Sequence, residues 1–573
     1  MNTKKQRWVV SIIFATLAAC LMTAFGQQPG FPSKDGQGSR PQSSIAGQYD
    51  VRAFGAKGDG KTVDTPAINR AIEVAAAEGG GTVHFPAGTY LCFSIHLKSH
   101  ITLYLDQGAT IVAADPSEVK GGYDLPEPNP WDKYQDFGHS HWHNSLIWGE
   151  GLEDVSILGP GMIWGKGLVR NGEESRTRAQ NDALRDVPTD PTAAPFGYPN
   201  LRDAVEPGWG NKAISLKLCR NVVIRDVTIS HGGHFAILAT GVDNLTLDNL
   251  KIDTNRDGID IDACRNVRVS NCSVNSPFDD AICPKSSYAL GFARATENVT
   301  ITNCQVSGYD EGTFLDGTYK REYHRYDRNS STGRIKFGTE SNGGFKNITI
   351  SNSVFDYCRG LALESVDGGL LEDVTINNIT MRDITNAPIF LRLGSRLRGP
   401  KEATRVGRIR RVIISNVVVY NANPRYGSII SGIPGYDIED LKLSNIRIDY
   451  QGGGTREQAA LEPPEKENDY PEPTMFGEIP AYGFFIRHVK RVEMNHVEVG
   501  FMKDDLRPAF VLTDVKDAEF NHVKAQAVVA VPVFALKNVE NFSTHQCRPV
   551  PDIRLERVKQ ENLFMKSERP EAR

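Results

Sequence analysis

The sequence predicts an all-β fold, a right-handed single-stranded parallel β-helix with an N-terminal helical cap. The first observation is a repeated motif, in which Asn or Asp precedes two aliphatic residues at alternate positions and then a second Asn or Asp. Most spacings lie in the twenties to low thirties, and copies begin at Asn221, Asn244, Asn266, Asn298, Asn347, Asp373 and Asp440. Such short units cannot bury an apolar face alone and must stack. Leucine-rich repeats need a leucine signature that is missing here, and a propeller needs longer antiparallel blades.

The second observation is the start of the folded region. Residues 51–90, VRAFGAKGDGKTVDTPAINRAIEVAAAEGGGTVHFPAGTY, combine a Gly-rich loop, an amphipathic helix over about 65–78 and a first strand. A solenoid exposes its core and strand edges at an open end, and this segment suits a cap over that end. We therefore expect the β-helix domain at 47–550 and a C-terminal tail at 551–573.

The third observation is an export signal. Basic residues at 4, 5 and 7 precede an apolar run over about 8–22, and AFG at 24–26 offers a cleavage site, which predicts a signal peptide at 1–26. Residues 27–46 are rich in Gln, Gly, Ser and Pro and predict a flexible leader. LAAC at 17–20 also resembles a lipobox. The alternatives are an exported periplasmic or extracellular protein and a lipoprotein anchored through Cys20.

Composition and charge limit the classes of binding partner that we expect. The net charge is −5 and no basic run occurs beyond the N-terminus, so we expect no nucleic-acid partner and no anionic membrane surface. No segment after the signal has the length and apolarity of a spanning helix. Four cysteines lie in or beside strands of successive repeats without CxxC spacing, and we expect them to be stacked core thiols: Cys264, Cys272, Cys283 and Cys304. We expect a monomer with no metal and no cofactor.

The stretch 253–285, DTNRDGIDIDACRNVRVSNCSVNSPFDDAICPK, places Asp257 about one repeat before Asp279 and Asp280. If the repeats stack, these acids become neighbours on one exposed face. Crowded carboxylates separate in pKa, so one can donate a proton while another activates water. An inverting glycosidase uses two carboxylates with room for a water between them. For Asp260 and Asp262, the alternative to a role in the site is that they are turn residues whose side chains bond the backbone.

The chain resembles glycoside hydrolase family 28, the polygalacturonases and their rhamnogalacturonan-cleaving relatives, over nearly all of its mature length. The resemblance rests on VRAFGAKGDGKTVDTPAINRAI, DGIDIDACRNV, the Asp279-Asp280 pair, Lys285-Ser286, FGTESNGGFKNI from Phe337, and Asn255-Arg256-Asp257 where the family has Asn-Thr-Asp. It implies inverting hydrolysis, with Asp279 protonating the glycosidic oxygen and Asp257 and Asp280 activating water. The expected substrate is pectic polysaccharide or its oligosaccharides, with contacts from Asn255, Asp260, Lys285, His231, His234, Lys336, Glu340 and Glu364.

Two family motifs are missing. The comparable positions for Gly-His-Gly contain no His, and His231 or His234, one repeat before Asp257, is a candidate replacement. The family's Arg-Ile-Lys, which binds the galacturonate carboxylate, corresponds to residues 362–364, Ala-Leu-Glu. An acid there repels a uronate. We therefore expect either that Glu364 bonds hydroxyls of a different sugar and homogalacturonan is a poor substrate, or that a cation comes from Lys336, Arg334, Lys320 or Arg392.

Another candidate group is His139, His141 and His143, which on a strand would share one face. Without a carboxylate or cysteine beside them, a sugar-contacting or structural role is favoured over a metal site. Three functions remain open for the chain. They are an inverting glycosidase, a non-catalytic carbohydrate-binding β-helix, and a calcium-dependent polysaccharide lyase on the same architecture.

Overall fold

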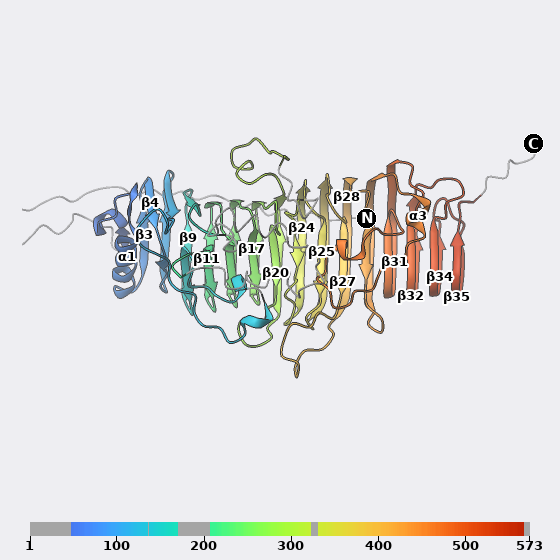
Figure 1. The fold of residues 1–573 in the computed structure, drawn as a ribbon, viewed down its shortest axis with the longest axis horizontal. Helices are drawn as coiled ribbons and strands as arrows, with labels where there is room; N and C mark the ends of the chain where they lie inside the picture. The colour runs from blue at the N-terminus through green and yellow to red at the C-terminus, as the bar shows by residue number, and fades with distance from the viewer. Residues whose placement is uncertain (1–46, 136, 170–206, 323–330, 567–573) are drawn as a thin grey trace, which may run out of the picture. The chain divides into compact units, whose positions relative to one another are not determined.

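The computed structural model describes residues 47–135, 137–169, 207–322 and 331–566, which belong to one compact unit, Ser44–Arg573. Its strands pair in parallel from one coil to the next, as the repeats predict, and Figure 1 shows them in chain order from β3 to β35. Among the described residues, no helix has both the length and the apolar character needed to cross a lipid bilayer. The expected signal peptide and leader lie outside the described residues.

Three columns of strands form the coils. Column one contains β1 (Gln48–Asp50), β3 (Gly81–Phe85), β6 (Ile101–Leu105), β9 (Glu153–Leu158), β12 (Arg220–Arg225), β15 (Asp243–Asp248), β18 (Arg265–Ser270) and β21 (Thr296–Thr302). Column two contains β2 (Asp59–Val63), β4 (Gly88–Cys92), β7 (Ala109–Ala113), β10 (Met162–Trp164), β13 (Thr228–Ser230), β16 (Lys251–Asp253), β19 (Ser273–Asn275) and β22 (Gln305–Ser307).

Column three positions the site. It contains β5 (Ile95–His96), β8 (Ile147–Glu150), β11 (Lys212–Lys217), β14 (Phe235–Thr240), β17 (Asp257–Asp262), β20 (Ile282–Lys285), β23 (Lys336–Phe337), β25 (Leu361–Ser365), β27 (Ile389–Leu393) and β29 (Ser428–Ser431). In later coils the columns are continued by the longer strands β24 (Phe345–Asp356), β26 (Leu370–Arg382), β28 (Arg408–Ala422), β30 (Ile438–Gly452), β31 (Phe484–Lys503), β32 (Phe510–Asn521) and β34 (Phe534–His545) and by the short strand β33 (Lys524–Ala525).

The predicted helical cap is confirmed. Helix α1 spans Thr65–Ala77 and buries Ala67, Ile68, Ala71 and Ile72 against the first coil. Short helices elsewhere are η1 (Val51–Phe54), η2 (Asp132–Tyr134), η3 (Phe137–His139), α3 (Arg456–Ala459) and η4 (Pro473–Phe476).

The residue that opens each repeat motif has a conformational role. Asn221, Asn244, Asn266, Asn298 and Asn347 all have φ between 55° and 57°, and Asn tolerates this left-handed region better than most residues. Their side-chain amides form a ladder, in which the last four each donate to the Asn of the preceding coil at 2.8–3.2 Å and Asn221 donates to Asp154 at 2.8 Å. The repeat motif therefore marks the turn between columns.

The C-terminal stretch differs from the expected tail. Residues Ile553–Leu563 form β35, which pairs antiparallel with β34. The last parallel strand of a solenoid leaves its backbone groups unpaired, and an added strand covers that edge. The four cysteines expected as core thiols are buried and unbridged.

Candidate functional site

Asp257, Asp279 and Asp280 lie on consecutive coils. Asp257 opens β17, and the other two precede β20. The backbone N–H of Asp280 donates to Asp257 Oδ1 at 3.1 Å. One carboxylate oxygen of each acid lies within 4.8 Å of the others. The structure thus brings together the three acids that the repeat spacing predicts as neighbours.

The expectation of an exposed face is wrong. Asp257 and Asp280 are each 2% exposed, whereas the side chain of Asp279 is 20% exposed. Asp260 and Asp262 are fully buried within β17 and occupy no turn. Strand β17 is therefore covered on both faces.

A covering segment, residues 123–135 and 137–145, explains this burial. It connects β7 to β8 and crosses later coils of column three, and in Figure 1 it is the cyan stretch. Asn129 Nδ2 donates to Ala289 O at 2.9 Å, and the buried Trp142 donates from Nε1 to Thr240 Oγ1 at 3.0 Å. The segment brings residues from an early part of the chain over the acids.

Two buried cations hold Asp280. Arg334 Nε donates to Asp280 Oδ1 at 2.9 Å, and Lys336 Nζ lies 3.1 Å from Oδ2. Burial by itself lowers the pKa of Lys336, but Asp280, Tyr470 and Glu364 together outweigh it and raise that pKa well above its ordinary value. Asp280 therefore lies between two buried cations.

Lys285 joins three other acids. Its Nζ lies 3.3 Å from Asp257, 3.2 Å from Asp260 and 3.6 Å from Glu340. Burial, followed by the charges of Asp260 and Asp279, raises the pKa of Asp257 well above its ordinary value, because one ammonium does not offset this crowding. Asp257 therefore retains a proton to higher pH than an isolated carboxyl does.

His139 is a site residue that sequence reasoning did not place with the acids. Its Nε2 lies 2.7 Å from Lys285 Nζ, 3.5 Å from Asp260 and 3.8 Å from Glu340, which also pairs with Arg398. The predicted strand with three imidazoles on one face is wrong, since His139 ends η3 and no strand contains His141 or His143. The sequence around His139 does not indicate that it lies beside the acids, because the covering segment crosses several coils to place it there.

The two expected replacement histidines lie apart. His234 is 6% exposed, and burial, with Arg256 next in effect, lowers its pKa well below the ordinary value. Its ring centroid is 6.1 Å from that of His139. His231 instead pairs with Glu311 at 2.6 Å. His234 thus borders the acid site, whereas His231 forms an ion pair with Glu311.

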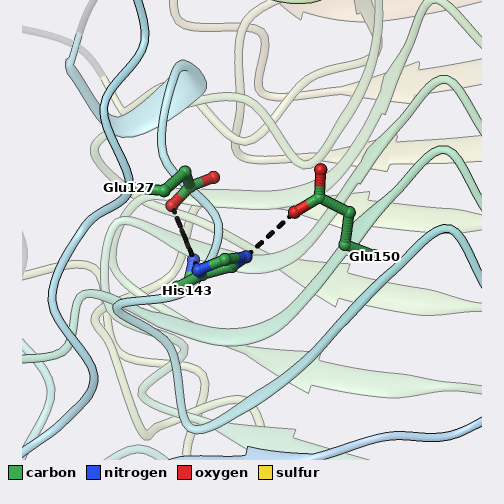
Figure 2. Close-up of side chains that lie close together, drawn as sticks. All are labelled: Glu127, His143 and Glu150. Atoms are coloured by element: carbon green, nitrogen blue, oxygen red, sulfur yellow. Dashed lines mark hydrogen bonds and ion pairs between the residues drawn. The ribbon is translucent and has the colours of Figure 1, made fainter.

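His143 lies between two carboxylates, as Figure 2 shows. Its Nε2 is 2.9 Å from Glu150, its Nδ1 is 3.9 Å from Glu127, and its ring stacks on Trp148 at 3.9 Å. Glu150 also forms an ion pair with Lys217, whose Nζ lies 2.9 Å away. Glu127 also accepts backbone N–H groups of residues 142 and 143. These contacts attach the covering segment to β8.

Glu364 does not face solvent, contrary to the expectation that it contacts sugar. It is 0% exposed and lies 3.9 Å from Lys336 and 4.0 Å from Arg334. Burial raises its pKa to about 8 despite those cations. Its carboxyl is therefore neutral in mildly acidic solution, and the predicted repulsion of a uronate has no physical basis. Of the alternative cations, Arg334 and Lys336 are in the site, whereas Arg392 bonds Ser431 and residues 432, 465 and 466.

A second covering segment, residues 461–477 between β30 and β31, reaches the site from later coils. Tyr470 Oη accepts from Lys336 Nζ at 3.2 Å. Glu472 pairs with Arg334 at 2.5 Å and with Arg359 at 3.1 Å. Sequence patterns gave no indication of these two residues, which long-range folding brings to Lys336 and Arg334.

Comparisons with known proteins agree with this architecture. The family described as "Rhamnogalacturonase A/epimerase, pectate lyase-like" matches residues 48–123, and "Right handed beta helix region" matches residues 205–290. The solved family 28 exopolygalacturonase of Yersinia enterocolitica is similar with a TM-score of 0.59 and 22% identity, over 83% of this chain and 78% of that one. The predicted right-handed parallel β-helix is thereby confirmed.

Curated relatives include polygalacturonases. A probable polygalacturonase of Vitis vinifera is 25% identical over 57% of this chain and 60% of its own length. An exo-poly-α-D-galacturonosidase of Dickeya chrysanthemi is 24% identical over 60% of this chain and 56% of its own length. The matches span less than two thirds of either relative. This chain is a divergent, polygalacturonase-like protein related to glycoside hydrolase family 28.

Proposed function

We propose that the protein is an exported glycoside hydrolase that cleaves pectic polysaccharide or its oligosaccharides by acid/base catalysis. The observation that carries the proposal is the unequal environment of three adjacent aspartates. Asp280 is held by two buried cations, Asp257 is buried among acids, and Asp279 is the most accessible of the three. Carboxyls in different environments can divide the roles of acid and base.

The roles follow from access and charge. Asp279 donates the proton to the glycosidic oxygen, because its side chain is the one a polymer reaches most easily. Asp280, which pairs with Arg334 and Lys336, accepts a proton from the attacking water, and Asp257 positions that water from the neighbouring coil. Lys285 and His139 hold Asp257 and Asp260 in place from behind.

Inversion of the anomeric centre is part of the proposal and rests on the family resemblance. The carboxylate spacing does not support it by itself, because the three acids have oxygens within 4.8 Å of one another, closer than the roughly 6.5–9.5 Å usual for inverting enzymes. NMR of the first-formed anomer tests this step. A retained configuration would overturn the inverting assignment and leave hydrolysis intact.

The test of the function is a reducing-sugar assay on homogalacturonan and rhamnogalacturonan, with the Asp279→Asn variant as the inactive control. We expect wild-type hydrolysis without absorbance from unsaturated ends, and no loss of activity on adding a chelator.

A polysaccharide lyase is the second candidate, favoured by the cations beside the acids and by the match to the pectate lyase-like family. Lys285 is a poor base for it, since Asp257 and Asp260 overcome the effect of burial and raise its pKa well above the ordinary value. Unsaturated products lost on chelation would favour the lyase. Binding without cleavage of either polymer would favour the non-catalytic alternative.

A further inference from the structure

Arg256 and Asp279 form the most accessible ion pair of the acid site in the described part of the chain. Arg256 Nη2 lies 2.7 Å from Asp279 Oδ2, and the side chains are 17% and 20% exposed. Lys285, Lys336 and Arg334 are 6%, 3% and 1% exposed. An incoming anion therefore meets Arg256 before the other three cations.

The backbone of Arg256 is fixed to the turns that carry the acids. Its carbonyl accepts from Ser276 Oγ at 2.6 Å, and the carbonyl of Asn255 accepts from the N–H of Phe278 at 3.1 Å. Asn255 itself is 4% exposed and acts here through its backbone. These bonds join the turn before β17 to the turn before β20, so the guanidinium starts beside Asp257 and reaches Asp279.

This ion pair conflicts with the role of Asp279. A guanidinium against a carboxylate favours the charged form, and a general acid must be protonated before it can donate. The other groups around Asp279 act differently: Asp257 and Asp280 oppose a further negative charge, while His234 and Tyr470 are also close enough to interact electrostatically. Removal of Arg256 from the pair would therefore let Asp279 take up a proton.

We propose that Arg256 binds the carboxylate of an acidic sugar next to the scissile bond and thereby converts Asp279 into a competent acid. The inference rests on the proposed hydrolase function. The Arg256–Asp279 ion pair breaks, a guanidinium–uronate pair forms, and one solvent proton joins Asp279 Oδ2. That proton then passes to the glycosidic oxygen as the glycosidic bond breaks. A planar guanidinium suits a carboxylate because it can donate two parallel hydrogen bonds.

The test compares pH profiles of kcat/KM, which report the free enzyme, with those of kcat, which report the complex. The substrates are a uronate oligosaccharide that the wild type cleaves and its methyl-esterified form. In the wild type acting on the free acid, kcat/KM should begin to fall with rising pH at a lower pH than kcat does. The reason is that bound substrate displaces Arg256 from Asp279, so that Asp279 holds its proton to higher pH in the complex. In Arg256→Gln the two basic limbs should coincide, and kcat/KM on the free acid should fall about 10- to 100-fold.

The preference for free acid over ester should also disappear in Arg256→Gln and be partly restored in Arg256→Lys. Arg265→Gln, which removes a similar pair with Glu297 at 2.9 Å on the next strand, should match the wild type in every profile. Coincident limbs in the wild type, or an unchanged acid preference in Arg256→Gln, would overturn the proposal. Absence of hydrolysis by the wild type would instead refute the function beneath it. If Arg256→Gln does not fold, the same pH profiles are measured on Arg256→Lys. The point charge of lysine should narrow the pH gap between the basic limbs of kcat/KM and kcat.

Discussion

One row of paired residues, which runs across the strands of column three, has charged members in one half of the molecule and apolar members in the other. It passes from Asp260 to Cys283 in the next coil, and through Lys336 and Ala362 to Phe390, Ile429 and Phe485. The charged members of this row and the apolar ones are equally buried, each at 2% exposure or less. The backbone geometry is therefore the same where the row carries chemistry and where it only packs.

The apolar half supports the charged half. Phe390, Ile429 and Phe485 form a cluster with Met475 and Phe476 of the second covering segment. This packing fixes the segment whose Tyr470 and Glu472 contact the site cations. Burying charges is unfavourable without partners, so the polar half needs these contacts, whereas the apolar half is stabilised by burial itself.

The sharpest test of the charged half is Asp279→Asn. Removal of a positioned acid should lower turnover about 10²–10⁴-fold, while the melting temperature stays at or above that of the wild type because like charges are relieved. Steady-state kinetics and thermal melting measure both. Asp226→Asn, at an exposed turn with φ 68°, is the control and should retain activity. Near-normal turnover in Asp279→Asn would remove this residue from the mechanism.

In the apolar half, Phe390→Ala should act on stability first. A large-to-small change at a fully buried aromatic costs about 3–5 kcal/mol, so the urea midpoint should fall clearly. Val418→Ala, at a side chain that is 50% exposed on β28, should change it little. A loss of activity in Phe390→Ala without any loss of stability would show that the two halves are not divided as described.

Glu364 lies at the boundary of the halves and should give a pH-dependent effect. Its folded-state pKa of about 8 lies above the ordinary value of 4.5, so the folded state holds an extra proton between these values and loses stability as pH rises through this window. Glu364→Gln cannot titrate. Its free energy of unfolding relative to that of the wild type should therefore increase from pH 5 to pH 8, by an amount on the order of a few kcal/mol at most, and thermal melting across this pH range measures the change. A constant difference across that range would contradict the assigned burial.

The smallest effect concerns the turns that both halves share. Asn266→Ala should cost about 1–2 kcal/mol because alanine resists φ of 55°, whereas Asn266→Gly should lose mainly the amide ladder. Melting temperatures should rank wild type first and alanine last. Equal values for alanine and glycine would mean that the ladder, not the backbone angle, is what the Asn supplies.

Sequence patterns were sufficient for the features that repeat. The motif that begins at Asn221 and recurs through Asp440 predicts the coil architecture, and its spacing places Asp257 beside Asp280. Local patterns could not show that loops cover the acids, since burial of Asp260 depends on a segment that starts many coils earlier. For the same reason Tyr470 and Glu472 escaped prediction, His139 was a candidate but was not placed beside the acids, and Glu364 was assigned to a surface it does not reach. Arg334 was named only as an alternative cation, and Lys336 was named both as a substrate contact and as an alternative, because a cation moved by one coil leaves no local signal.

The second covering segment also has a consequence for the order in which the protein matures. Arg392 binds its carbonyl at residue 465, and Arg487 of β31 binds those at residues 463 and 464. Coils that contact only their neighbours can form in succession, so a nascent chain synthesised through β27 already holds the three aspartates in stacked coils. Tyr470 and Glu472 arrive only when β31 closes behind them. A chain interrupted before β31 would therefore contain every aspartate of the acid site and still lack the strand that anchors the second covering segment over it.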